Sequence, residues 1–222
     1  MALRRVVRSH GERTRAKLIE VAGRLFAERG FHAATGKEIC RRAGVHAAAI
    51  VYHFHGMHGL YRAVLAEAQR RLVSTEALSA AVAAEHDPVR KLTAFLALIV
   101  RALTSPVSRS WAGKLFGREF VTPSAAYGRS HDRALTARAA LLKSIVSSLT
   151  GLAADDPALA RACLNIMAPC AVMLLFDRHK LQRILPDLAL GAADAASITQ
   201  HLVAFAIGGL ETLKQRGTSR AR

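Results

Sequence analysis

The stretch Thr35–Phe54, TGKEICRRAGVHAAAIVYHF, decides the fold of the N-terminal part of this chain. It opens on Thr35 and Glu38, a Thr-x-x-Glu capping box that predicts a helix beginning just after Thr35. Gly44 interrupts this helix, and a second short helix is predicted from about His46 to Phe54. Two short helices joined by a glycine that permits a left-handed turn are typical of a helix-turn-helix.

The second predicted helix begins with small residues, Ala47, Ala48 and Ala49, which would let its backbone lie deep in the major groove of DNA. Basic side chains flank it on both sides, and they are Lys37, Arg41, Arg42, His53 and His58. An ordinary helical hairpin in an all-helical protein fits the same geometry, so the spacing alone leaves both interpretations open.

Working outward from this stretch, residues 1–11 are predicted to be a flexible basic arm, and a helix is expected from Thr14 until Gly30 ends it. Apolar residues recur at helical spacing between them, at Leu18, Val21, Ala22, Leu25 and Phe26. A longer helix is expected from about Met57 to Ser74. The domain boundaries expected from this pattern are 12–72 for a DNA-binding domain and 73–222 for a C-terminal helical domain.

Cap and proline signals continue through the second part of the chain. Asp87-Pro88 and Asp156-Pro157 each place an N-cap residue before a proline in the first helical turn. The further helices expected are 87–103, 111–120, 122–149, 156–174 and 194–214. Because no strand-like alternation stands out, the fold class expected is all-α with about nine helices.

The composition favours a folded, soluble protein with a polyanionic partner. Apolar residues make up 51% of the 222 residues, and the formal net charge is +16. Residues 1–45 hold 11 basic and 4 acidic side chains, a net of +7. Nucleic acid or an anionic membrane surface would attract such a charge, although a generic basic surface remains the alternative.

Several functional classes are excluded by what the sequence lacks. Its longest apolar runs, Leu92–Val100 and Met167–Phe176, fall short of the roughly 20 residues that span a bilayer, so no membrane insertion is expected. The N-terminus lacks the apolar segment of a secretory signal. The three cysteines, Cys40, Cys163 and Cys170, form no close-spaced pair, which suits a reducing cytoplasm.

The residues around the predicted helix-turn-helix resemble the N-terminal domain of the tetracycline-repressor (TetR) family over about residues 12–70. The resemblance is carried by Lys17–Phe26, Gly30–Thr35, Glu38–Val45, Ala49–Phe54 and Gly59–Tyr61. It implies a homodimeric repressor with a three-helix DNA-binding domain, and a C-terminal helical domain that binds a small molecule and dimerises through its last two long helices. The C-terminal half is similar to the CecR (YbiH-like) subgroup at Phe116–Phe120, Pro123, Leu152–Pro157 and Phe205–Leu213.

The resemblance implies DNA contacts residue by residue. Thr35 corresponds to a phosphate contact at the start of the second helix, and Tyr52 and His53 to backbone contacts at the end of the recognition helix. Base reading is expected from His46, Ala47, Ala48 and Val51. Three positions depart from the family, because His46 and Val51 replace polar residues common in relatives, and Met57 replaces a phosphate-binding Lys. His55 and His58 lie nearby and would partly substitute for that Lys.

Two sets of residues are candidates for roles in the C-terminal domain, with ordinary core packing as the alternative for each. A ligand pocket is predicted from an aromatic cluster, Phe95, Leu98, Trp111, Phe116, Phe120 and Tyr127. A four-helix dimer interface is predicted from apolar stripes on the last long helices, comprising Leu159, Cys163, Ile166, Cys170, Ile198, Leu202, Phe205, Gly209 and Leu213.

Other motifs carry little chemistry. His53, His55 and His58 form a His-x-His-x-x-His cluster, but phosphate contact or simple surface placement is favoured over a metal site, and none is predicted. No nucleophile–base pair or cofactor motif is evident, so neither an enzyme nor a cofactor is expected.

The sequence predicts that this protein is a DNA-binding repressor. Its expected partners are a double-stranded DNA operator, a second copy of itself and an unidentified small molecule. The alternative is a basic helical protein that binds nucleic acid or anionic surfaces without sequence specificity.

Overall fold

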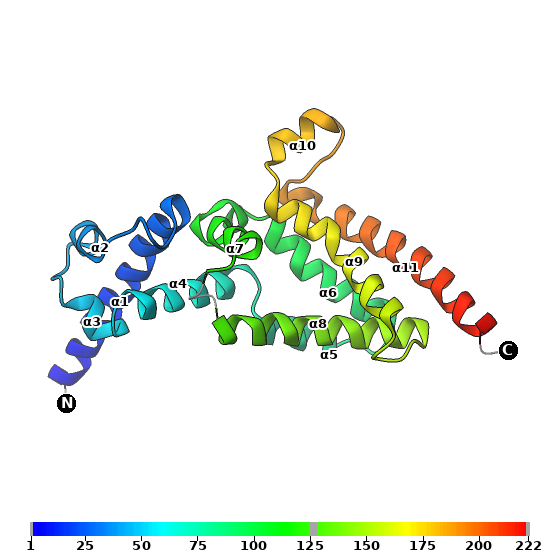
Figure 1. The fold of residues 1–222 in the computed structure, drawn as a ribbon, viewed down its shortest axis with the longest axis horizontal. Coiled ribbons are helices and arrows are strands. Elements are labelled where there is room, and N and C mark those ends of the chain that lie inside the picture. The colour runs from blue at the N-terminus through cyan, green and yellow to red at the C-terminus, as the bar shows by residue number, and fades with distance from the viewer. Residues whose placement is uncertain (1, 125–127, 221–222) are drawn as a thin grey trace. The chain divides into compact units, whose positions relative to one another are not determined.

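The computed structural model describes residues 2–124 and 128–220, and its regular elements in those ranges are all helices (Figure 1). The all-α class is therefore confirmed. The α-helices are α1 (Ala2–Arg29), α2 (Gly36–Ala43), α3 (Ala49–Phe54), α4 (Met57–Leu72), α5 (Thr75–Ala83), α6 (Pro88–Thr104), α7 (Trp111–Val121), α8 (Gly128–Thr150), α9 (Pro157–Leu175), α10 (Arg178–Ile184) and α11 (Ala195–Arg220). Two short 3-10 helices, Pro106–Arg109 and Ala192–Asp194, complete the described elements. Helices α5 and α10 were not predicted.

The chain forms two compact units. The first comprises Met1–Leu72 together with Arg109–Gly128, and the second comprises Val73–Ser108 together with Arg129–Arg222. The first segment of the first unit thus ends at Leu72, where a domain boundary was expected. The second segment of this unit carries α7 and lies within the range that was expected to form the C-terminal domain.

Three helix boundaries differ from those expected. Helix α1 begins at Ala2, so residues 2–11 are helical where a flexible arm was predicted; their Ala, Leu and Arg are strong helix formers. Helix α3 begins at Ala49, because residues 46–48 form a turn. Helix α8 begins at Gly128 and not at the Thr122-Pro123 signal. There Ser124 donates from its backbone N–H and its hydroxyl to Glu119 of α7, at 2.9 and 3.0 Å, so the chain stays attached to α7 after that helix has ended at Val121.

The core of the first unit lies between α1, α4 and α7, with α2 and α3 packed beside α1 and α4. The ring of Phe26 meets that of Tyr61 edge-on, with centroids 4.8 Å apart, and Phe31 packs on the same tyrosine. Helix α7 reaches α1 through Trp111, whose ring lies directly against Gly23. Any side chain at Gly23 would overlap that ring, so the glycine permits the close approach of the two helices.

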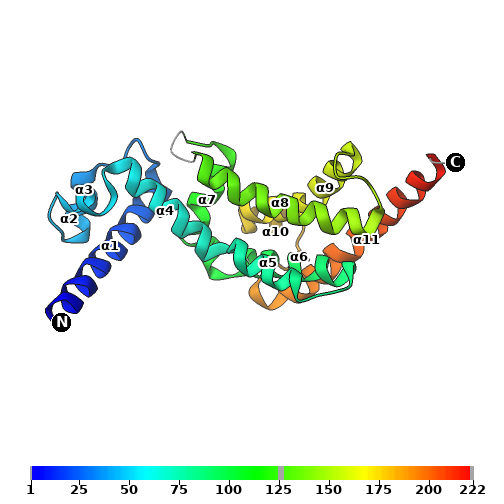
Figure 2. The ribbon, with the colours of Figure 1, turned by 90° about the horizontal axis from the view of Figure 1, so that it is seen from below.

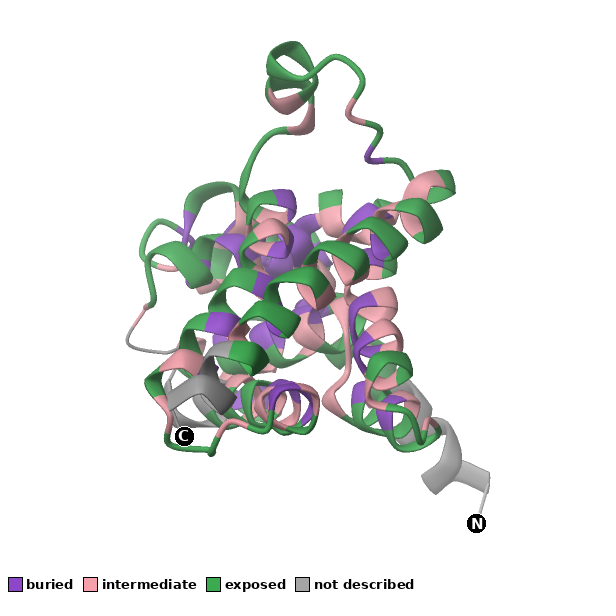
Figure 3. Ribbon diagram, turned by 90° about the vertical axis from the view of Figure 1, so that its right-hand side faces the viewer, coloured by how far each residue is buried: buried purple, intermediate pink, exposed green. Residues whose placement is uncertain are grey.

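The second unit is built around α6, which packs against α5, α9 and α11 (Figures 1 and 2). Figure 3 shows the buried positions gathered where these helices face one another. The fully buried apolar residues include Leu78, Leu92, Phe95, Leu96, Val146 and Leu159. Helix α10 and its flanking loops stand out from this core and are largely exposed (Figure 3). Arg178 joins α10 to the unit by donating to the Leu103 carbonyl oxygen and, at 3.3 Å, to the Ser108 hydroxyl.

Among the described residues, α9 is the one helix whose length and apolar composition would suffice to cross a membrane. Its Leu159, Ile166, Cys170 and Met173 side chains are buried in the core of the second unit. The apolar character of α9 therefore has a structural use in this unit. Pro169 lies inside this helix, which continues past it to Leu175.

Candidate nucleic-acid interface

The first helix of the predicted helix-turn-helix is fixed at both ends by local interactions. The Thr35 hydroxyl oxygen accepts a hydrogen bond of 3.3 Å from the Glu38 N–H, as the capping sequence predicted. Gly44 ends α2 in the left-handed conformation, with φ of 61°, and its N–H donates to the Arg41 carbonyl. Because an L side chain rarely adopts that conformation, the glycine determines where α2 stops and the chain turns towards α3.

The second helix presents one face to the core and the other to solvent. Ile50 and Phe54 are buried, whereas Val51 is 64% and Tyr52 78% exposed. His46, Ala47 and Ala48 form an exposed turn immediately before α3. We call residues 46–52 the recognition segment. In a helix-turn-helix such a segment enters the major groove, and here its outer surface is uncovered.

The Lys and Arg side chains predicted to contact phosphates differ in whether an acidic residue already pairs with them. Lys37 and Arg41 are exposed. Arg42 is held by Glu38 at 2.7 Å, and the same carboxylate contacts Arg29 of α1 at 3.3 Å. Arg42 is therefore a less available phosphate contact than Arg41. The ion pair between Arg29 and Glu38 connects α1 to α2, the helix that precedes the recognition segment.

The histidines are placed by aromatic contacts and by the turn between α3 and α4. His53 packs edge-on against Tyr52, with ring centroids 4.8 Å apart, and His58 lies against Phe31 at 4.9 Å. His55 ends α3 in the left-handed conformation with φ of 58°. Met57, which departs from the family pattern, places its thioether against Gly36 at the start of α2. It therefore makes a packing contact at the place where the family would hold a phosphate-binding cation.

Within the described residues, no group of three or more His, Cys, Asp or Glu side chains is arranged to hold a metal ion. His53, His55 and His58 thus do not converge. The three cysteines are unpaired. Burial raises the pKa of Cys170 to about 11, which makes it a packing residue and a poor nucleophile at neutral pH.

Tyr61 and Glu119 form a buried contact that sequence reasoning missed. The Tyr61 hydroxyl on α4 donates to the Glu119 carboxyl group on α7, and Glu119 is only 2% exposed. Burial, reinforced by the hydrogen bond and charge of Glu119, raises the pKa of Tyr61 well above its usual range, so its hydroxyl remains a donor. Glu119 is the one carboxyl group in α7, whose other charged residues are Lys114 and Arg118, and this lone acidic residue was the available signal.

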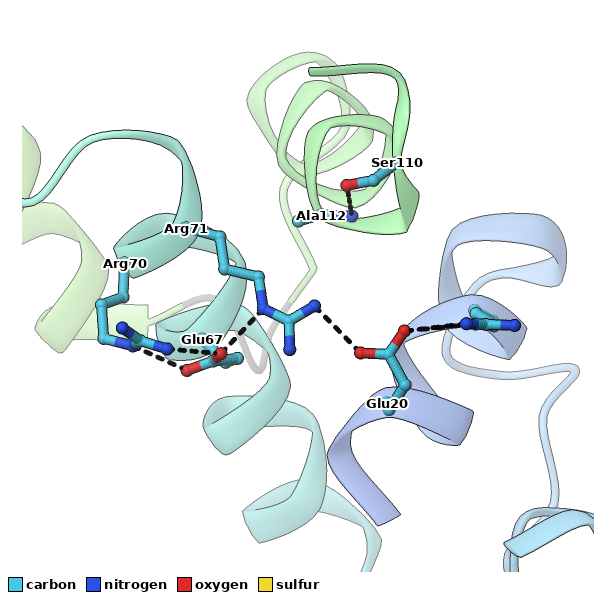
Figure 4. A network of polar contacts seen from close by, with 7 residues as sticks. Glu20, Glu67, Arg70, Arg71, Ser110 and Ala112 are labelled. Carbon is cyan, nitrogen blue, oxygen red and sulfur yellow. Dashed lines mark hydrogen bonds and ion pairs between the residues drawn. The ribbon is translucent and has the colours of Figure 1, made fainter. Parts of the chain in front are cut away.

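A second polar network joins α1 to α4 (Figure 4). Arg71 contacts Glu67 at 2.8 Å and Glu20 of α1 at 2.9 Å, and its guanidinium stacks over the Trp111 ring at 4.9 Å. Arg70 also contacts Glu67, at 2.8 Å, and this hydrogen bond is the main reason that the pKa of Glu67 is lowered. Beside the network lies a cavity of about 300 Å³ lined by Glu20, Arg24, Ala27, Glu28, Arg71, Ser110, Trp111 and Lys114.

The residues predicted to line a ligand pocket are divided between the two units. Phe95 and Leu98 belong to the second unit, where Phe95 is buried in the core. Trp111, Phe116 and Phe120 belong to the first unit, and Phe120 is exposed. Tyr127 lies outside the described residues. Of this set, Trp111 lines the cavity of about 300 Å³ in the first unit, and the pocket as a whole stays a prediction.

A short, exposed recognition helix held by a capped helix and a glycine turn defines a DNA-binding protein of the helix-turn-helix class. Two family models agree with this class. Residues 18–64 match the bacterial regulatory proteins of the tetR family, and residues 88–210 match the C-terminal domain of the HTH-type transcriptional dual regulator CecR. The chain belongs to the TetR family of transcriptional regulators, in the CecR subgroup.

Individual relatives are more distant. The HTH-type transcriptional regulator UidR of Escherichia coli K12 is 26% identical over 68 residues, which are 31% of this chain and 35% of UidR. The match thus spans about a third of that relative. A putative transcriptional regulator from Pseudomonas aeruginosa PAO1 has a TM-score of 0.65 at 22% identity, covering 91% of this chain and 94% of that one.

Two further solved structures share the fold. The ketosteroid regulator KstR2 of Mycobacterium tuberculosis gives a TM-score of 0.62 at 17% identity, covering 88% of this chain and 93% of its own. AibR, solved in complex with isovaleryl coenzyme A and operator DNA, gives 0.58 at 15% identity, covering 86% and 97%. At these identities the likeness concerns the fold alone.

Proposed function

We propose that this regulator is a cytoplasmic homodimeric repressor that binds a specific operator through its recognition segment and releases it when a small molecule binds the second unit. The observation that carries the operator proposal is the exposure of Val51 and Tyr52, at 64% and 78%, on a helix whose other face is buried. Apolar and aromatic groups so exposed are suited to base edges and sugar–phosphate contacts.

The proposal of a dimer is supported by apolar residues that the monomer leaves uncovered on its last long helices. Leu164 on α9 is 68% and Phe205 on α11 is 80% exposed. Gly208 and Gly209 have open space where a side chain would stand, which would allow another helix to approach closely. A second copy that covers these residues would also supply the second recognition segment that a palindromic operator requires.

The dimer interface predicted from the sequence needs revision. Leu159, Ile166 and Cys170 are buried in the core of their own unit, so their side chains face α6 and its neighbours and not a partner. Cys163, Ile198, Leu202 and Leu213 are partly buried against the same core. Phe205 and Gly209 are the exposed members of that set, and Leu164 joins them.

Oligomeric state is measured by light scattering on the full chain at micromolar concentration. The proposal expects a dimer that Phe205→Glu combined with Leu164→Glu converts to a monomer. The matched control is Ile184→Glu, which changes an apolar side chain that is 74% exposed but belongs to α10 and to neither of the two long helices. A wild-type monomer, or a dimer that only Ile184→Glu disrupts, would contradict the proposed interface.

Operator binding is tested by genome-wide mapping of bound DNA, followed by affinity measurements on a recovered site and on random DNA at two salt concentrations. The proposal expects a preference of about 10³-fold or more for the recovered site. Equal affinities would favour the alternative of a basic protein that binds DNA without sequence specificity. The genes beside the bound sites would then guide the choice of effector, for which the acyl-CoA complex of the neighbour AibR suggests a first class to examine.

A further inference from the structure

The turn before α3 holds the His46 side chain in one orientation. The Nδ1 atom of His46 accepts a hydrogen bond of 3.3 Å from the Ala48 N–H. The His46 carbonyl oxygen accepts another, of 3.0 Å, from the Ala49 N–H. The imidazole therefore acts as the short polar side chains that usually cap a helical turn do, by accepting from the N–H two residues ahead.

This hydrogen bond determines which ring nitrogen carries the proton. A nitrogen that accepts a hydrogen bond bears no proton, so in the neutral ring the proton lies on Nε2. His46 is exposed, and Nε2 is the ring nitrogen that the turn leaves without this contact. Towards a ligand, the side chain consequently offers a hydrogen-bond donor and no acceptor.

The rest of the segment offers no competing polar group before Tyr52. Residues 47–51 are Ala, Ala, Ala, Ile and Val, and none has a side-chain donor or acceptor. Ala47, Ala48 and Val51 are exposed. Between positions 46 and 51 the only side chain that can hydrogen-bond to a base edge is thus His46, while its neighbours can contact the methyl group of thymine.

We infer that His46 is the specificity-determining residue of this regulator and that it reads a guanine in each half-site. The major-groove edge of guanine carries two acceptors, N7 and O6, that suit a donor-only side chain. Cytosine presents an amino donor, which would oppose the Nε2–H. Adenine adds an amino donor beside its N7, and thymine offers one acceptor beside a methyl group. This inference rests on the proposed sequence-specific binding of DNA.

The variant that separates base reading from folding is His46→Ser. Serine is a good N-cap, so it replaces the contact to the Ala48 N–H, but it is too short to reach a base as histidine does. The matched control is Arg41→Gln, which removes an exposed cation from α2 beside the segment. Removing a phosphate-binding cation weakens binding to all sequences about equally.

The experiment selects preferred sites from a randomised duplex library with the full-length wild type and both variants, then measures affinities for single-base changes. At one guanine per half-site we expect the wild type to prefer G·C over C·G by about 5- to 150-fold, the usual effect of one mismatched base pair. In His46→Ser we expect this preference to fall below about twofold, while the other positions keep theirs. Arg41→Gln should keep every preference.

The outcomes separate the role of His46 from the proposed sequence-specific binding of DNA. A wild type that enriches no motif contradicts sequence-specific binding itself. A wild type that enriches a motif which His46→Ser reads with unchanged preferences overturns the role of His46 and leaves operator binding intact. If His46→Ser instead abolishes the preference at a position that holds any base other than guanine, the assignment of the base is overturned.

Discussion

Replacing Tyr61 by Phe removes one hydroxyl from the core of the first unit and leaves the ring in place. The hydroxyl donates to Glu119, a carboxyl group that is 2% exposed and whose other described donors are the N–H and hydroxyl of Ser124. The edge-on contact between the Tyr61 and Phe26 rings, at 4.8 Å, is retained by phenylalanine. The substitution therefore tests the hydrogen bond and not the packing.

Losing a hydrogen bond to a charged acceptor in a buried site lowers the free energy of unfolding by about 1.5–3 kcal/mol. Because Ser124 continues to donate to Glu119, we expect a value near the lower end, about 2 kcal/mol. With a urea dependence of about 1–3 kcal/mol per molar, the unfolding midpoint should fall by roughly 1 M.

The assay is urea unfolding followed by tryptophan fluorescence. Trp111 is the single tryptophan of the chain, is 8% exposed and belongs to the same unit as Tyr61. The control is Tyr52→Phe, which removes a hydroxyl from a side chain that is 78% exposed and should change stability by less than about 0.5 kcal/mol. A Tyr61→Phe midpoint that matches that of Tyr52→Phe would refute the reasoning.

Three further predictions concern the same unit and its binding surface. A Cβ at Gly59 would overlap the Phe54 carbonyl oxygen, so Gly59→Ala should lower the free energy of unfolding by about 3 kcal/mol or more. The control is Gly208→Ala, in open space on α11, which should leave the free energy of unfolding unchanged or slightly raised. Similar effects of the two variants in urea unfolding would contradict the clash. His55 and His58 are exposed and lie beside Met57, which stands where the family holds a phosphate-binding Lys, so a His55→Gln/His58→Gln double variant should bind the operator more weakly in fluorescence anisotropy. An unchanged affinity would argue against these two residues as phosphate contacts. Hydrogen bonds from Arg70 and Arg71 help to lower the pKa of Glu67, and the stability this contributes is present above the unfolded-state pKa and is lost as the pH falls through the folded-state value. Glu67→Gln should therefore reduce the acid-induced loss of stability below about pH 4.5, and an unchanged acid profile would show that the ion pairs contribute nothing.

Features that depend on neighbouring residues were predictable from the sequence. Thr35 caps α2 and Gly44 ends it, because both act on backbone groups within a few residues. The unpredicted helices also carry local signals, since Ser74 caps α5 by accepting from the Ala77 N–H and Asp177 caps α10 by accepting from the Lys180 N–H. These two helices have only 9 and 7 residues, which is too few for the repeat of apolar residues that identifies a longer helix in a sequence.

Features that join distant parts of the chain were not predictable from periodicity. Tyr61 and Glu119 are 58 residues apart, and neither position shows which residue the other faces. Of the aromatic residues predicted to line a pocket, Trp111 packs against Gly23 of α1 and lines the cavity beside Arg71, and neither neighbour is evident from the residues around it in the sequence. The orientation of His46 likewise depends on the φ and ψ angles of a turn that the sequence alone placed inside a helix.

The participation of α7 in the first unit bears on how the protein is made. A ribosome adds about 5–20 residues per second, so the 52 residues from Val73 to Ser124 take roughly 3 to 10 seconds to follow Leu72. During that interval the surface of α1 that Trp111 covers has no partner on the nascent chain, and the Tyr61 hydroxyl has no Glu119. The DNA-binding unit thus completes its folding only after more than half of the polypeptide has been synthesised.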